Sequence, residues 1–227
     1  MKNYFKSKIG QKQLVAVSGI SLVLFLIAHV VGNFNMFIGP EAMNAYAKAL
    51  KSLGGGSLIW FARLGLLSMF VIHFGLVFYL ILENIKARGS SYSKPLHKKT
   101  RSLFTKMMRF SGLIVFLYII FHLIDYTFTP HTDLNSTIDG HYLGLYGHVY
   151  NSFLNPIRSF WYIIAMISIS MHLIHGVQSV VQTFGFYHAV YTPLIVKLSW
   201  AVAIFIGVGF SSVPVYVLLH HYNNWSI

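Results

Sequence analysis

Hydrophobic residues along this chain gather into five long stretches that carry almost no charge, separated by polar connections. The stretches are Leu14–Phe37, Leu58–Leu82, Phe110–Phe128, Ser159–Phe184 and Leu198–Leu219, each given approximately. At about 1.5 Å per residue, each is long enough to cross about 30 Å of hydrocarbon. A segment in lipid must satisfy its own backbone hydrogen bonds, so each should be helical. The pattern predicts an all-α integral membrane protein: a five-helix transmembrane bundle forming one membrane domain, residues 1–227.

The charged residues predict how this bundle is oriented. There are 17 Lys and Arg against 5 Asp and Glu. Most of the basic residues precede the first stretch, follow the second, or precede the fifth, and these three segments share one side of a five-span chain. Cytoplasmic loops carry an excess of Lys and Arg. We therefore expect the N-terminus in the cytoplasm and the C-terminus outside, with the basic residues meeting anionic lipid rather than nucleic acid.

Two of the connections have recognisable patterns. Glu41–Lys51 places Met43, Ala47 and Leu50 on one helical stripe, which is typical of a helix lying at the membrane interface. Three consecutive glycines, residues 54–56, should end it. Thr129–Pro156 is polar and rich in turn residues, and we expect a long external loop. We find no internal repeat.

Composition narrows the chemistry further. Only 10% of the residues are charged, against roughly 25% in an ordinary soluble domain. The chain has no Cys, which excludes a thiolate metal site, a protein-held iron–sulfur cluster and covalently attached haem. It has neither a P-loop nor a dinucleotide-binding glycine motif. It does have 12 His, an unusual number for so few charges.

Four of these histidines fall at two depths in four different stretches. Measured from the outer ends, His29 and His122 lie about 12 and 9 Å deep, whereas His73 and His172 lie about 23 and 20 Å deep. An ionisable residue at membrane depth indicates a functional site. Two facing imidazoles in an apolar bundle suit bis-histidine ligation of a b-type haem. We therefore expect two haem b, about 11 Å apart along the membrane normal.

The remaining histidines carry weaker signals. His175 lies three residues after His172 on the same helix face, and periodicity alone cannot decide which of the two would bind iron. A further group lies in the predicted loop and fits no zinc-ligand spacing, so we expect it to be solvated. This group is His131, His141 and His148. The others lie in connections or at span ends, where an interfacial position explains them: His97, His188, His220 and His221.

Small and polar residues near these histidines are candidates to accommodate two flat cofactors. Five glycines lie within or at the edges of the same stretches, where they either leave room for a cofactor or allow close helix packing: Gly19, Gly32, Gly75, Gly112 and Gly176. Haem propionates need cationic or hydroxyl partners near the interfaces. The candidates are Arg63 and Arg158 on the outer side and Ser18, Lys8, Arg101 and Arg109 on the inner side.

Three segments carry a resemblance to a known family. They are IGQKQLVAVSGISLVLFLIAHVVGN (Ile9–Asn33), SMHLIHGVQSVVQTFG (Ser170–Gly185) and YTPLIVKL (Tyr191–Leu198). Between about Tyr4 and Phe210 the chain resembles the cytochrome b subunit of succinate:quinone oxidoreductases in its five-helix, two-haem form.

The resemblance implies a ligand set. His29 and His122 would ligate the distal haem, and His73 and His172 the proximal one nearer the cytoplasm. The family's fourth ligand is followed by a glycine and then by an aromatic–glycine pair. Gly176 and Phe184–Gly185 stand at those distances from His172 and not from His175.

The resemblance also implies partners and a place of action. The chain would be the membrane anchor of a succinate dehydrogenase or fumarate reductase (respiratory complex II, tricarboxylic acid cycle) in a bacterial inner membrane. It would pass electrons between an iron–sulfur subunit and a quinone, with menaquinone suiting the two-haem form. FAD and the clusters would belong to the flavoprotein and iron–sulfur partners, and the dicarboxylate chemistry would lie outside this chain. The segment Lys86–Arg109 and the N-terminal segment would form much of the docking face.

Some alternatives stay open at this point. The chain could serve another dehydrogenase, such as a hydrogenase or formate dehydrogenase, or be a transporter or anchor without haem. The direction, succinate oxidation or fumarate reduction, is undetermined. Asn33, Asn35 and Arg63 are the candidates for the quinone site. Glu83 and Asp125 both lie near span ends, so we predict no carboxylate proton path through the middle of the bundle.

Overall fold

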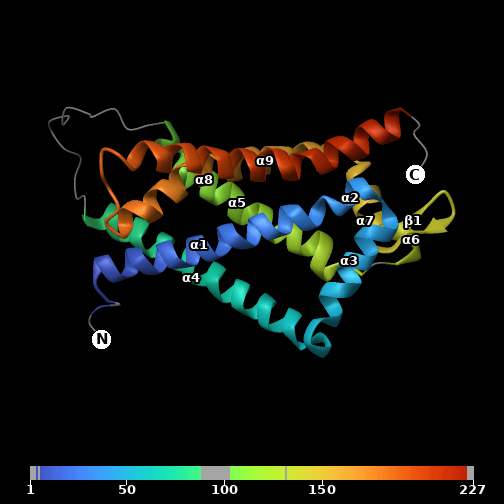
Figure 1. The fold of residues 1–227 in the computed structure, drawn as a ribbon, viewed down its shortest axis with the longest axis horizontal. Coiled ribbons are helices and arrows are strands. Elements are labelled where there is room, and N and C mark those ends of the chain that lie inside the picture. Colours follow the sequence, from blue (N-terminus) through green and yellow to red (C-terminus); the bar gives the residue numbers. More distant parts are fainter. Residues whose placement is uncertain (1–3, 5, 88–102, 131, 224–227) are drawn as a thin grey trace.

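Five long helices run side by side along the molecule (Figure 1). The structure is a computed structural model that describes residues 4, 6–87, 103–130 and 132–223. The long helices are α1 (Lys8–Asn33), α4 (Ser57–Ala87), α5 (Leu103–Leu123), α8 (Pro156–Thr183) and α9 (Thr192–Tyr222). In each of the five spans the helix is long and apolar enough to cross a membrane. The prediction of a mainly helical chain with five helices able to span a membrane is confirmed.

Two of the long helices, α1 and α8, begin before their apolar stretches because a polar residue caps the first turn. Ser7 accepts a hydrogen bond from the backbone N–H of Gly10, which starts α1 six residues before Leu14. Asn155 accepts from the N–H groups of Ile157 and Arg158 and starts α8 in the same way. For these two helices, the hydrophobic pattern predicts the span and the capping residue determines where the helix starts.

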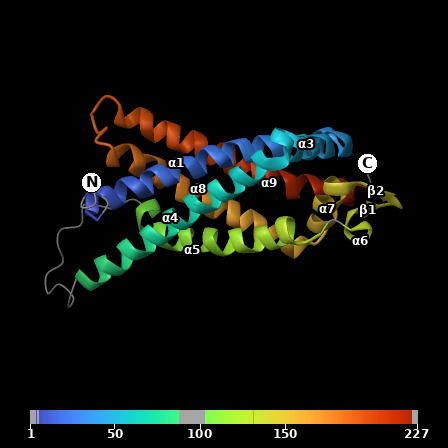
Figure 2. The ribbon, with the colours of Figure 1, turned by 90° about the horizontal axis from the view of Figure 1, so that it is seen from below.

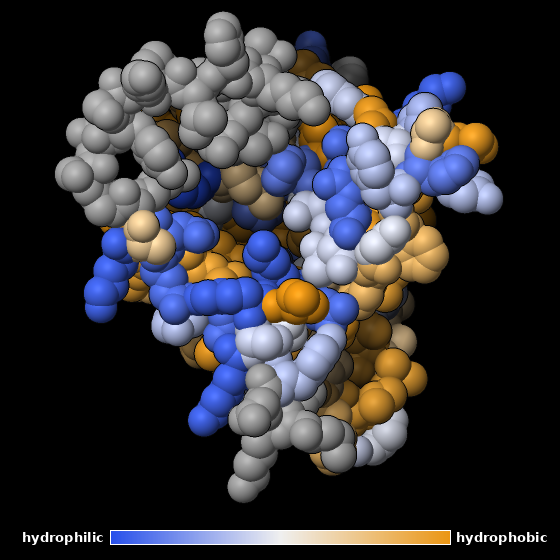
Figure 3. Space-filling model, turned by 90° about the vertical axis from the view of Figure 1, so that its left-hand side faces the viewer, coloured by the Kyte–Doolittle hydropathy of each residue, from blue (hydrophilic) through white to orange (hydrophobic). Residues whose placement is uncertain are grey.

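One end of the bundle, which we call the basic end, collects the exposed lysines. It holds the start of α1, the end of α4 and the turn between α8 and α9 (Figure 1). Its exposed basic residues include Lys6, Lys12, Lys86 and Lys197. Figure 3 looks at this end and shows hydrophilic side chains gathered across it, with apolar side chains on the flanks.

The opposite end, the loop end, is built from the shorter elements. They are α2 (Asn35–Ile38), α3 (Pro40–Ser52), η1 (Leu53–Gly56), η2 (Ile124–Phe128), α6 (Asp133–Ser136), β1 (Thr137–Ile138), β2 (His141–Tyr142) and α7 (Gly144–Phe153). The predicted helix over Glu41–Lys51 is confirmed as α3, with Met43 buried. Its position at a membrane interface stays a prediction. The turn after it contains Gly54 and Gly55 at positive φ, a conformation that favours glycine.

The expectation of an open loop over Thr129–Pro156 is wrong. This segment contains α6, an antiparallel pair of two-residue strands, and α7. Six residues of α7 are buried, among them Tyr146 and Tyr150. Asn44 of α3 fastens this region, since its side chain donates to the carbonyl of Leu143 at 2.8 Å and accepts from the N–H of Leu145 at 2.9 Å. The loop end is therefore a packed cap.

The tightest packing lies between α8 and α9, and α4 is the least enclosed helix. Ala165, Ala203 and Ile206 are each fully buried, and Ser170 donates across the α8–α9 contact to the carbonyl of Ala203 at 2.9 Å. No residue of α4 is buried in the described structure. It packs along α1 (Figure 2) and meets α5 through Phe74 and Phe116, whose ring centroids are 4.0 Å apart.

Candidate functional site

His29 of α1 and His122 of α5 face each other, and we call them the loop-end pair. Their ring centroids lie 5.8 Å apart and the ring planes are 78° apart. Metal–imidazole bonds are about 2 Å long, so two imidazoles on opposite sides of one metal ion have centroids about 6 Å apart. The structure therefore brings these two residues to the separation that a shared axial pair requires.

Aromatic rings surround the loop-end pair. Phe25 stacks on His29 with centroids 5.2 Å apart, and Phe210 lies 5.4 Å from it. The Tyr118 hydroxyl lies 3.5 Å from Nδ1 of His122. Aromatic side chains from α1, α5 and α9 therefore line this pair.

His73 of α4 and His172 of α8 form a second group, the basic-end pair. Nδ1 of His73 lies 3.1 Å from the carbonyl oxygen of Val15 and 3.3 Å from the hydroxyl of Ser18. A carbonyl oxygen only accepts hydrogen bonds, so Nδ1 carries the proton. Nε2 is then the nitrogen with the free lone pair, which is the one that can bind a metal.

His172 has the same type of partners on α5. Its Nδ1 lies 3.4 Å from the hydroxyl of Ser111, and the carbonyl of Met108 is a further hydrogen-bond partner. His172 also interacts electrostatically with His73 and with His175. Ser111 of α5 therefore lies beside His172, one of the two candidates on α8.

Two glycines make room for these imidazoles. A Cβ added at Gly19 would stand 3.2 Å from Cε1 of His73, and one added at Gly112 would stand 3.3 Å from Cε1 of His172. Gly32 instead packs against the ring of Tyr46. Gly75 and Gly176 have no described atom within 4 Å of such a Cβ, so open space lies beside them.

The histidine contacts reveal a short repeat that the hydrophobic pattern did not indicate. Ser18 and Gly19 precede His29 by eleven and ten residues, and Ser111 and Gly112 precede His122 by the same intervals. The first and third spans therefore each carry a Ser–Gly step that contacts a histidine from the next span. Each of these two spans also has a histidine of its own, about 15 Å further along the helix. In the sequence, this repeat consists only of a Ser–Gly step and a histidine eleven residues after the serine. So short a pattern cannot be recognised before the contacts are known.

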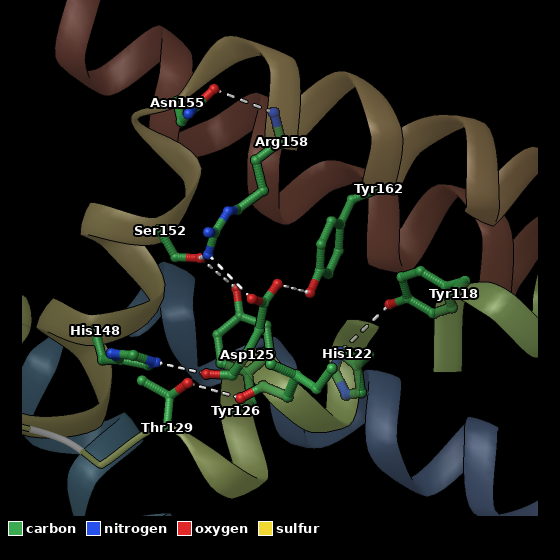
Figure 4. A network of polar contacts seen from close by, with 11 residues as sticks. Tyr118, His122, Asp125, Tyr126, Thr129, His148, Ser152, Asn155, Arg158 and Tyr162 are labelled. Carbon is green, nitrogen blue, oxygen red and sulfur yellow. Dashed lines mark hydrogen bonds and ion pairs between the residues drawn. The ribbon is translucent and has the colours of Figure 1, made fainter. Parts of the chain in front are cut away.

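A polar network lies beyond the loop-end pair (Figure 4). Asp125 accepts a hydrogen bond from the hydroxyl of Tyr162 at 2.7 Å and forms an ion pair with Arg158 at 3.3 Å. Arg158 also donates to Ser152 at 3.0 Å. Asp125, Ser152 and Arg158 help to line a pocket of 470 Å³. Arg158, a predicted propionate partner, is therefore engaged with a carboxylate at this end.

Two histidines are less exposed than the sequence suggested. His148 was expected in a solvated loop, but it is 6% exposed and its Nε2 donates to the carbonyl of Asp125 at 2.9 Å. His220, expected at an interface, is 5% exposed and its Nδ1 lies 3.2 Å from the hydroxyl of Tyr150. Both are covered because α7 packs against the spans. His141, His188 and His221 are exposed, while His97 and His131 lie outside the described residues.

The other polar candidates within the described residues have partners outside the histidine rings. Lys8 forms an ion pair with Glu83, which ties α1 to α4 at the basic end. Arg63 lies over the ring of Trp60 at 5.1 Å. Asn33 and Asn35 donate to backbone carbonyls of their own segment. Arg109 is exposed, and Arg101 lies outside the described residues.

The histidine pairs are compatible with the ligands that a haem requires from a protein. Within the described ranges, no three His, Asp or Glu side chains gather where they could hold a metal ion. A b-type haem needs only two axial ligands from the protein, because the macrocycle supplies the rest. Two histidine pairs without cysteine, each contributed by two helices, fit that need.

Comparison with known proteins found no match: no family model, curated protein or solved structure matches this chain.

Proposed function

We propose that this chain is the dihaem cytochrome b subunit that anchors a succinate:quinone oxidoreductase in a bacterial inner membrane. The observation that carries the proposal is the grouping of four intramembrane histidines into two pairs. His29 and His122 meet at 5.8 Å, and His73 and His172 interact nearer the basic end. The resemblance of the quoted segments to that family supplies the identity of the complex.

The histidine pairs would hold two b-type haems at two depths. When bound, a haem with two imidazole ligands supplies one-electron transfer. The chain's own task is to hold the imidazoles in line, to surround them with apolar side chains and to keep water out. At the loop end, the rings of Phe25 and Phe210 lie against His29 and would form part of this apolar surrounding.

The basic end would face the cytoplasm and dock the partner subunits. Its exposed lysines match the positive-inside rule, and they suit contact with acidic protein surface and anionic lipid. The flavoprotein, with FAD, and the iron–sulfur protein would bind here, so that electrons pass from the clusters through the two histidine levels to membrane quinone, with menaquinone as our preference.

Purification of the tagged chain from its native membrane tests the identity of the complex. We expect a flavoprotein and an iron–sulfur protein to co-purify, and succinate to reduce the haem in the purified complex. Co-purification of hydrogenase or formate dehydrogenase subunits would instead assign the chain to that enzyme and contradict the proposal.

A further inference from the structure

We propose that Ser18 and Ser111 are positioning residues: each hydroxyl, with the carbonyl three residues before it, holds the Nδ1–H of His73 or His172 so that Nε2 points to the iron. We call each such group of serine, carbonyl and following glycine a histidine seat. The inference rests on the proposed function, because it assigns a role to residues around two of the four proposed ligands.

The first seat lies on α1. The hydroxyl of Ser18 donates to the carbonyls of Leu14 and Val15, at 2.8 and 3.1 Å. Its proton is therefore committed to its own helix, and its lone pairs remain for His73 at 3.3 Å. Ser18 is 1% exposed. Because this hydroxyl is buried and faces another helix, its hydrogen-bond partner is the imidazole of His73 rather than solvent.

The second seat lies on α5 and repeats the first. The hydroxyl of Ser111 donates to the carbonyl of Met108 at 3.1 Å and lies 3.4 Å from Nδ1 of His172. Ser111 is 3% exposed. In both seats the glycine after the serine lets the imidazole lie on the helix backbone, since a Cβ there would stand 3.2–3.3 Å from Cε1.

The seats have a specific consequence for the basic-end pair. A partner at the far nitrogen of a ligating histidine fixes its tautomer and ring orientation and raises its basicity. A more basic imidazole stabilises the oxidised metal. Loss of a seat hydroxyl should therefore raise the midpoint potential at the basic-end site and leave the loop-end site unchanged.

The test uses Ser18→Ala and Ser111→Ala in the intact complex, with Ser21→Ala as the matched control. Ser21 lies on α1, and its hydroxyl bonds only its own helix at the carbonyl of Val17 among the contacts described. Loss of such a partner typically changes metal affinity about 10-fold or more. Where a 10-fold loss falls on the oxidised iron alone, the one-electron midpoint rises by about 59 mV.

Redox titration and the low-spin electron paramagnetic resonance signal report each haem separately. We expect both haems to remain bound, with an upward shift confined to the component that His73→Ala removes. Midpoints and signals equal to those of Ser21→Ala would overturn the proposal, as would equal shifts of both haems.

A second pair of variants keeps the test decisive if the alanine variants fail to assemble. Gly19→Val and Gly112→Val fill the seats and should remove the basic-end haem while the loop-end haem remains. Gly65→Val on α4 is the control, because no described atom lies within 4 Å of a Cβ there. Retention of both haems in the seat-filling variants would contradict the seats. A wild-type complex without haem would instead contradict the proposed function.

Discussion

At the scale of single residues, the proton on each imidazole decides what the histidine can do. The hydrogen bond to the carbonyl of Val15 fixes the tautomer of His73 with the proton on Nδ1, and Nδ1 of His172 lies beside Ser111 in the matching position. This leaves Nε2 of each as the nitrogen that can bind a metal. His175 shares the helix and the level of His172, but the seat on α5 receives His172.

This difference predicts unequal effects of two neighbouring substitutions. His172→Ala should remove one of two haems, and the reduced-minus-oxidised b-type absorbance should fall by about half. His175→Ala should retain both, since the Ser111 contact that we assign to a haem ligand is made by His172. Absorbance spectra of the two purified variants check this, and the reverse result would reassign the ligand.

The sorting of the four histidines into two pairs could be predicted from the sequence, whereas the serines that contact their rings could not. Rise per residue fixes depth, so counting sorted His29 and His122 from His73 and His172. Which serine meets which imidazole depends on how the helices rotate about their axes and pack. No local pattern reports that rotation, and the seats could not be predicted for this reason.

At the scale of elements, the loop end depends on contacts between segments far apart in the chain. The Asn44 side chain of α3 joins Leu143 and Leu145, about one hundred positions away, at the start of α7. The sequence predicted α3 because its apolar stripe is a local pattern. It did not predict α7, whose buried face includes polar residues such as His148 and reads as a loop.

Asn44→Ala should therefore loosen α7 without disturbing the histidine pairs. Loss of its hydrogen bonds should cost about 1–3 kcal/mol of local opening free energy. Hydrogen exchange at the amides of α7 should accelerate accordingly, and Asn84→Ala, at an exposed position of α4, should not affect it. Unchanged exchange in α7 would refute the role of this clamp.

The same cap should be sensitive to alkali. Burial, followed by the neighbouring Tyr216, raises the pKa of Tyr146 well above its usual value of 10. Burial also raises the pKa of Tyr150, with Tyr216 and Asp139 adding to the effect. The unfolded cap ionises first, so this stability is complete below about pH 10 and is lost as pH rises above it.

Exchange at the α7 amides should therefore increase above about pH 10 by more than the intrinsic rate does. Tyr146→Phe should reduce that excess, and Tyr142→Phe, at an exposed position, should not. An excess that is the same in both variants would show that these tyrosines do not set the alkaline limit.

At the scale of the whole molecule, the uneven charge distribution predicts one orientation in the membrane. Lys86 and Lys197 are exposed at the basic end, and Lys51 is exposed at the loop end.

The number and order of spans followed from hydrophobicity alone, because each span is a local property of its residues. The packing of α4, with no buried residue, did not follow, since all five stretches read alike.

Single-cysteine variants test the orientation cleanly, because the chain has no Cys of its own. A membrane-impermeant maleimide added to intact cells should label Lys51→Cys and spare Lys197→Cys. Permeabilised cells should label both. The opposite pattern in intact cells would invert the topology and place the docking face outside.

The most direct test of the account is the haem content of the purified chain. Two histidine pairs at two levels predict two non-covalent haem b per chain, measured as the extracted haem per mole of protein, together with a dithionite-reducible b-type spectrum. A chain purified from its native membrane with no haem b would contradict the central claim.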